Sequence, residues 1–261
     1  MSEPNPGKRP AVRHAGRFQL FTGVLVFVAV ASLALAGVFA ATGGDQSSTE
    51  ETWSSFKPSS DGLETGARQI ADHVGRQYRL PNGQQIVAVT GGPLEFPVEQ
   101  ENLPMRIAVR TSPADGGDIT VLEGRGVLYR MCGLGDKCAI SEGKPSGERA
   151  LLLRREALEL ALYSFRYLDD IEHVVVFIPP PRGENPSNAV HFVRDDVAGQ
   201  LSRPLRATLP TPVPNADTIT TAPNTPAIQA LTFANLFKFS LTVGNQDANV
   251  FLVLDPLPTG S

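Results

Sequence analysis

The longest run of hydrophobic positions in the chain extends from Phe18 to Ala41 and contains no charged residue. As a helix this run would be about 36 Å long, and the hydrocarbon core of a bilayer is about 30 Å thick. Lys8, Arg9, Arg13 and Arg17 precede the run, whereas residues 42–60 contain one basic residue, Lys57. Because basic flanks stay in the cytoplasm, the pattern predicts a cytoplasmic tail at 1–17, a bilayer-spanning helix at 18–41 and an extracytoplasmic remainder.

A cleaved secretory signal is the alternative interpretation of this run. Ala34-Leu35-Ala36 and Val38-Phe39-Ala40 resemble the small-residue sites at which such signals are cut. The apolar run is longer than the roughly 7 to 15 residues of a signal core, which favours an uncleaved anchor. Both interpretations place the rest of the chain outside the cytoplasm.

Two amphipathic patterns predict the main helices of the exported part. Residues 42–60 are polar and rich in Ser, Thr and Gly, as in a flexible tether, and Asp61 can then cap a helix that ends before Pro81. The second helix is expected at 147–168, where Leu151, Leu158, Leu162 and Phe165 share one face. Its charged positions form only a narrow polar stripe, so we expect most of its circumference to be buried. The stripe consists of Arg155, Glu156, Glu159 and Arg166.

Short β-prone runs separated by Gly and Pro predict the strands. We expect them at 85–90, 106–110, 118–122, 126–131, 173–178 and 190–194. The run at 173–178 is rich in β-branched residues and is followed by three prolines, which is typical of a central strand that ends abruptly. A short helix is expected at 196–201. Apolar and polar residues alternate at 237–243, and this segment with 250–254 predicts a C-terminal hairpin.

The order of these elements predicts an α+β fold rather than alternating βαβ units. We expect one N-terminal transmembrane helix, followed by an extracytoplasmic domain in which a mainly antiparallel sheet packs on two main helices. The domain would comprise residues 61–203, and residues 227–261 would complete it as a hairpin. Between them, residues 204–226 contain six prolines and predict an extended connection.

Composition and charge restrict the class of function. A content of 41% hydrophobic and 19% charged residues is that of an ordinary globular protein, so the soluble part should fold. The net charge is −4, and four of the basic residues lie in the first 17. The exported part is therefore more acidic than the whole chain. Such a domain gains nothing from counterion release, which makes nucleic acid an improbable partner.

The two cysteines, Cys132 and Cys138, are predicted to form a disulfide, because the expected location is outside the reducing cytosol. A zinc site would need two further ligands, for which only His173 and His191 are candidates, and neither shows paired ligand spacing. A redox pair usually has two intervening residues rather than five. We therefore expect a structural bridge, with no metal and no cofactor.

The candidates for catalysis are His173, His191, Asp169 and Asp170. Both histidines lie in expected strands, and the two acids follow the long helix, so they could serve general acid–base hydrolysis if they met in one cleft. Ordinary strand histidines and turn-forming aspartates are the simpler interpretation. The chain has no Gly-x-Ser-x-Gly elbow, phosphate-binding loop, His-Glu-x-x-His or dinucleotide fingerprint.

Three functional hypotheses remain on this basis. The first is a non-enzymatic, membrane-anchored domain of the cell envelope that binds a ligand or a protein partner. The second is a membrane-anchored hydrolase that uses the histidines and carboxylates named above. The third is an accessory subunit of a larger membrane complex. An anchor, a tether and the missing catalytic signature favour the first.

Overall fold

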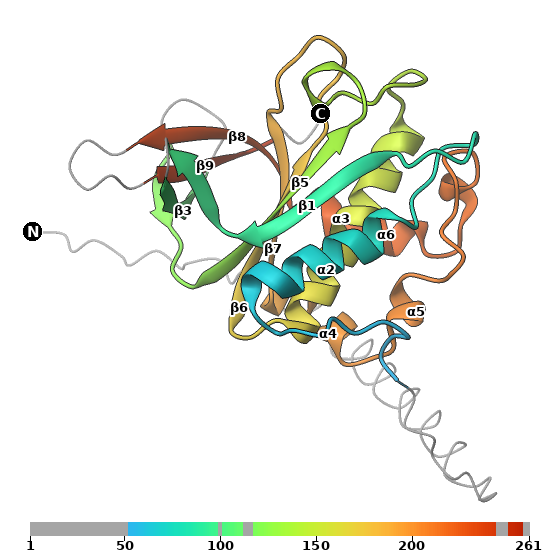
Figure 1. Cartoon of the computed structure of the whole chain (residues 1–261), viewed down its shortest axis with the longest axis horizontal. Helices are drawn as coiled ribbons and strands as arrows, with labels where there is room; N and C mark the ends of the chain where they lie inside the picture. The colour runs from blue at the N-terminus through green and yellow to red at the C-terminus, as the bar shows by residue number, and fades with distance from the viewer. Residues whose placement is uncertain (1–51, 99–100, 112–116, 244–249, 258–261) are drawn as a thin grey trace, which may run out of the picture. The chain divides into compact units, whose positions relative to one another are not determined.

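The computed structural model of the chain describes residues 52–98, 101–111, 117–243 and 250–257 (Figure 1). The chain divides into two units, 1–51 and 52–261, and only the second contains described residues. The predicted tail at 1–17 and the predicted span at 18–41 therefore lie outside them. Within the described residues, no helix is both long enough and apolar enough to cross a membrane.

One mixed sheet organises the described unit. Its strand order is β1-β5-β6-β7-β8-β9-β3-β2, and β4 also pairs with β3. The pairs β5–β6 and β3–β9 are parallel, and all other pairs are antiparallel. The strands are β1 (Val87–Pro93), β2 (Glu95–Val98), β3 (Glu101–Arg110), β4 (Ile119–Val121), β5 (Arg125–Gly133), β6 (Ile171–Ile178), β7 (Asn188–Val193), β8 (Leu236–Val243) and β9 (Val250–Pro256).

A single residue, Leu94, nearly closes this sheet into a barrel. The strands β1 and β2 lie at opposite ends of the strand order, yet only Leu94 separates them along the chain. The Leu94 N–H donates to the carbonyl of Gly126 in β5, at 3.2 Å, and the Met105 N–H in β3 donates to the Leu94 carbonyl, at 3.0 Å. The two edges of the sheet are thus joined through one bent segment, as the closure of a barrel requires.

The strands β5, β6 and β7 separate two hydrophobic cores. On β6, Val175 and Phe177 belong to the core inside the barrel, whereas Val174 and Val176 belong to the core under the helices. Alternate side chains of a strand point to opposite faces, so β6 is apolar on both. This double burial explains the continuous run His-Val-Val-Val-Phe-Ile, which the sequence indicated as a central strand.

The helices cover the outer face of β1, β5, β6 and β7. They are α2 (Leu63–Gly75), α3 (Gly147–Tyr167), α4 (Ala198–Leu201), α5 (Leu205–Thr208) and α6 (Thr225–Phe233), with short 3-10 turns at Asp136–Cys138, Asp195–Val197 and Ile219–Thr221. The long helix α3 packs on β6, β7, α2 and α6. Figure 1 shows α2, α3 and α6 on this side of the sheet, with β3, β8 and β9 away from them.

The predicted fold class is wrong in its sheet and in its helices. The sheet is mixed and nearly barrel-shaped rather than mainly antiparallel, because β6 and β9 each add in parallel to a strand that lies far away in sequence. Five α-helices are described rather than two main ones. The predicted C-terminal hairpin is confirmed as β8 and β9, and the predicted long helix is confirmed as α3.

Residues from the expected flexible tether and from the expected extended connection pack onto the domain. In the expected tether, Trp53 is buried and its ring lies 5.4 Å from that of Tyr163. In the Pro-rich connection, Leu209 and Ile219 are buried in the core under the helices. Proline prevented long helices there, but it did not prevent single apolar side chains from filling the space beside α3.

The close approach of α2 to β1 predicts a strict requirement for glycine at position 91. A Cβ at Gly91 would overlap the Tyr129 ring and would lie 2.8 Å from the Ala67 carbonyl oxygen. We expect Gly91→Ala to lower the free energy of unfolding by about 1 to 3 kcal/mol, measured by urea denaturation. Gly92→Ala is the matched control, because its Cβ would meet only the Glu64 carboxylate at 3.6 Å. Equal stabilities of the two variants would contradict this packing.

Candidate functional site

The structure brings His173 and His191 together inside the barrel. His173 lies on β6 and His191 on β7, on the face that also carries Val175. His191 Nε2 and His173 Nδ1 are 3.2 Å apart, and His173 Nε2 lies 2.8 Å from the Glu123 carbonyl oxygen. A carbonyl only accepts, so His173 Nε2 carries a hydrogen and His173 Nδ1 accepts from His191. Two neutral rings can form this pattern without a further partner.

The environment of His191 opposes its protonation. His173 is 6% exposed and His191 is 4% exposed. Burial, followed by the neighbouring His173, lowers the pKa of His191 to about 3. A general base needs contact with solvent or substrate and a pKa near the working pH. A buried and hydrogen-bonded pair is better suited to holding two strands together.

The two predicted acids are not part of this pair. Asp169 and Asp170 lie exposed in the turn between α3 and β6. The Asp169 N–H bonds to the Asp61 carbonyl at 3.4 Å, and the Asp170 carboxylate lies 3.9 Å from the Arg125 guanidinium. The His173 ring instead bonds to a backbone carbonyl and to the His191 ring. Within the described residues, no group of three His, Cys, Asp or Glu side chains could hold a metal ion.

A second polar cluster lies buried beside α3. The Tyr78 hydroxyl donates to Glu159 Oε2 at 2.6 Å and accepts from the Arg155 guanidinium, which lies 3.3 Å from the same carboxylate. Arg155 also donates to the Pro210 carbonyl at 2.8 Å. Arg155, Glu156 and Glu159 are all at most 3% exposed. The residues expected to form a narrow polar stripe are thus largely buried, because the segment after α2 and the Pro-rich segment cover them.

The Glu156 carboxyl group is the unbalanced member of this cluster. Arg155 neutralises Glu159, whereas both Glu156 oxygens are buried without a hydrogen-bond partner among the described residues. Burial and the nearby charge of Glu159 raise the pKa of Glu156 well above its usual value. Glu156 is therefore held protonated and uncharged in the folded protein. An uncharged acid surrounded by protein contributes to the core rather than to chemistry at the surface.

The third candidate is a pocket of about 430 Å³ between α3 and the segment of three prolines after β6. Its walls come from the loop before α3, from the first two turns of α3, from Pro179–Arg182 and from the junction of α6 with β8. Leu153, Ile178 and Leu236 give it an apolar lining. Three arginines, Arg149, Arg154 and Arg182, also line it. Pockets with apolar walls and a few charged groups are typical sites for small ligands.

Two other hollows are of about 320 and 550 Å³. In the first, Arg130 lies opposite Glu64 and Glu95. In the second, Asp72 accompanies Lys57 and Arg76. Charges of both signs line these hollows, so neither favours an ion of one sign. The pocket beside α3 differs because its charged lining residues are all basic.

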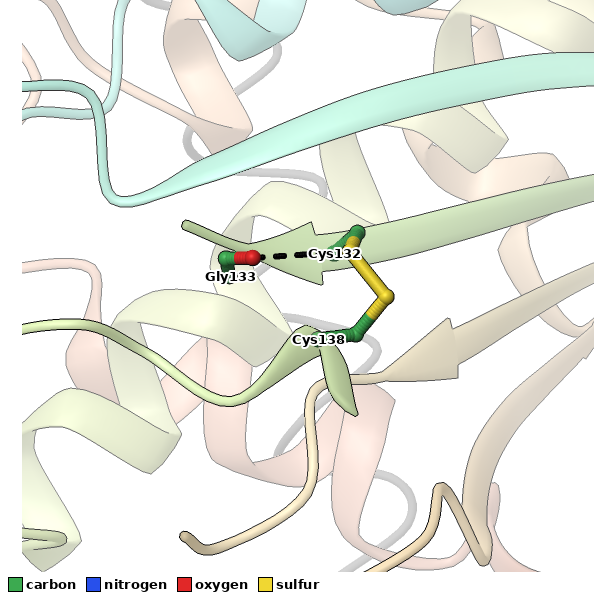
Figure 2. Close-up of a disulfide and its surroundings, with 3 residues drawn as sticks. All are labelled: Cys132, Gly133 and Cys138. Carbon is green, nitrogen blue, oxygen red and sulfur yellow. Dashed lines mark hydrogen bonds between the residues drawn. A yellow bond between two sulfur atoms is a disulfide. The ribbon is translucent and has the colours of Figure 1, made fainter. Parts of the chain in front are cut away.

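The predicted disulfide between Cys132 and Cys138 is present, and it holds one wall of this pocket. Figure 2 shows the bridge joining the end of β5 to the turn that follows. The Gly135 N–H bonds to the Ala139 carbonyl at 2.8 Å and closes the same turn. Ile140, the next residue along the chain, lines the pocket. The bridge therefore restricts the loop from which the pocket wall is built.

No local motif in the sequence indicated the pocket or the buried cluster. The pocket-lining residues come from four separate segments, so only the tertiary fold brings them together. For the cluster, the only signal was the spacing of Arg155 and Glu159, four residues apart on a helix with an otherwise apolar circumference. Comparison with protein-family models, with curated proteins and with solved structures found no match for this chain.

The buried Glu156 predicts a stabilising substitution. In the unfolded chain Glu156 ionises normally, so folding at neutral pH requires it to take up a proton. Because the pKa of Glu156 is raised in the folded state, the contribution of this residue to the free energy of unfolding is favourable at low pH. It is lost as the pH rises above the pKa that Glu156 has in the unfolded chain. We expect Glu156→Gln to raise the free energy of unfolding by about 1 to 3 kcal/mol at pH 7 and little at pH 4. Glu184→Gln, on the exposed surface, should change nothing.

The histidine pair predicts the opposite dependence on pH. The folded pKa of His191 lies below its unfolded value, so the unfolded state binds more protons between about pH 6.5 and pH 3. The contribution of His191 to the free energy of unfolding is therefore complete above this window and is lost as the pH falls through it. We expect His191→Gln to reduce this slope, which can reach about 1.4 kcal/mol per pH unit, in urea denaturation of the Glu156→Gln background. An unchanged slope would contradict the assignment.

Proposed function

We propose that the chain is an exported, non-enzymatic binding domain of the cell envelope, held at a membrane through its N-terminal region. The pocket beside α3 carries the binding part of this proposal, because it combines apolar walls with charged side chains of one sign. The uncharged run at 18–41 with its basic flank supports attachment to the membrane. The Cys132–Cys138 disulfide supports a location outside the reducing cytosol.

The geometry of the histidine pair favours binding over hydrolysis. A hydrolase of the kind considered above needs a histidine that can exchange protons with a substrate at working pH. His173 and His191 are buried, and the hydrogens on their Nε2 atoms are engaged. Among the described residues, neither a histidine nor a carboxylate lines the pocket beside α3. Its arginines and aliphatic side chains can hold a ligand, but they provide no general base.

The location is tested by labelling introduced cysteines, which is direct because Cys132 and Cys138 are both in the disulfide. Ser55 is exposed and belongs to the unit proposed to lie outside, whereas Ser2 belongs to the tail proposed to lie inside. We expect a membrane-impermeant maleimide to label Ser55→Cys on intact cells and Ser2→Cys only after lysis. The reverse pattern would show that the orientation is wrong.

The binding site is tested by photolabelling the full chain in its own membranes with a diazirine derivative of dodecanol. We expect the labelled peptides to come from the pocket walls, which are the loop before α3, the first turns of α3 and the three-proline segment. Ala150→Trp should abolish this labelling, because Ala150 lines the pocket and an indole there would fill it. Ala207→Trp, at an exposed position on α5, is the matched control and should leave it unchanged. Labelling spread over unrelated surfaces would exclude the pocket as the site.

A further inference from the structure

The charges around the pocket beside α3 are not balanced by acidic groups. Its lining contains three arginines and, among the described residues, no Asp or Glu. Arg149 donates to the Glu142 carbonyl at 2.6 Å, and Arg182 donates to the Ser141 carbonyl. Both acceptors are neutral backbone groups. The nearby Glu142 carboxylate is itself engaged by the side chain of Asn82, at 2.7 Å.

Arg154 is the group best placed to receive a ligand. It is half-buried on α3, one residue after the buried Leu153 that also lines the pocket. Unlike Arg149 and Arg182, Arg154 forms no hydrogen bond or ion pair with any described residue. Partial burial lowers the pKa of its guanidinium, which nevertheless stays charged at neutral pH. A desolvated and unpaired guanidinium presents five N–H donors that fit a carboxylate or a phosphate.

The remaining walls indicate what the rest of the ligand is. Aliphatic side chains and proline rings supply most of the lining, and Phe233 stands 61% exposed at its edge. Besides the arginines, Ser146 and Asn188 are the only described lining residues with polar side chains. The Ser146 hydroxyl already accepts from the Arg149 N–H at 3.2 Å. A sugar or a nucleotide needs many convergent polar partners, since buried polar groups left unpaired weaken binding. The pocket therefore fits a body that is mainly hydrocarbon.

From this combination we infer that the pocket binds a single-chain amphiphile with an anionic head, either a carboxylate or a phosphate. The anionic head pairs with Arg154, and Arg149 and Arg182 line the same pocket. The hydrocarbon chain lies along Leu153, Ile178 and Leu236. Such molecules are available at a membrane surface, so the inference rests on the proposed function and specifies its ligand. Arg149 and Arg182 also hold the loop before α3 in place, which makes Arg154 the residue to test.

The test is competition for photolabelling of the full chain in its membranes by the diazirine derivative of dodecanol. Dodecanoate, dodecyl phosphate, dodecanol and dodecylammonium are added as competitors of equal chain length. We expect at least one of the two anions to reduce pocket labelling at about one-tenth or less of the dodecanol concentration, since a charge-assisted hydrogen bond is replaced by a neutral one. Dodecylammonium should compete least. The more effective anion identifies the head as carboxylate or phosphate.

Arg154→Gln supplies the decisive variant, because it removes the charge but keeps most of the side chain. The anions should then compete no better than dodecanol, while the neutral probe still labels the pocket and so reports an intact fold. Arg154→Lys should restore part of the preference. If dodecanol competes as well as both anions in the unaltered chain, the anionic class is wrong, although the pocket remains a binding site. If the probe never labels the pocket, both the ligand class and the proposed function fail.

Discussion

The burial of β5, β6 and β7 on both faces is the constraint on which the rest of the fold depends. Inside the barrel, Val175 and Phe177 meet the side chains of β3, β8 and β9. On the outer face, Val174 and Val176 meet those of α2 and α3. A strand that is buried on both faces consists mainly of apolar residues, and distant segments must cover it. The helices therefore pack on the outer face of these strands, and the C-terminal hairpin packs on the face inside the barrel.

The same arrangement explains which features the sequence could predict. Local periodicity identified α3, β6 and the hairpin β8–β9, since each is a continuous pattern within one segment. The parallel pairs β5–β6 and β3–β9 join segments separated by long stretches of chain, and a single sequence carries no local signal of such pairing. The closure of the sheet through Leu94 could not be predicted for the same reason. Arg155, Glu156 and Glu159 were expected as a narrow polar stripe, because helical periodicity does not show which neighbours will cover a face.

In the candidate sites too, features within one segment could be predicted from the sequence, and features that join distant segments could not. The disulfide could be predicted, because the expected compartment and the proximity of Cys132 to Cys138 in sequence were sufficient. The two histidines were named as candidates that could meet in one cleft, with ordinary strand histidines as the simpler interpretation. The structure brings them into contact, but their burial was not visible from the alternating pattern around His191. The pocket beside α3 could not be predicted from any motif. Only the fold brings Pro179–Pro181 next to the first turns of α3.

The buried histidines, the buried Glu156 and the pocket residue Arg154 therefore have different physical roles. His191 and Glu156 lie where burial disfavours their charged forms, which links the protonation of each to the stability of the fold. Arg154 lies in an open pocket where its charge is retained, and no acid of the described chain neutralises it. A charge that folding leaves unpaired and partly desolvated gains most from a partner that arrives later. That difference, more than the number of polar residues, is the reason why we propose this pocket as the ligand site.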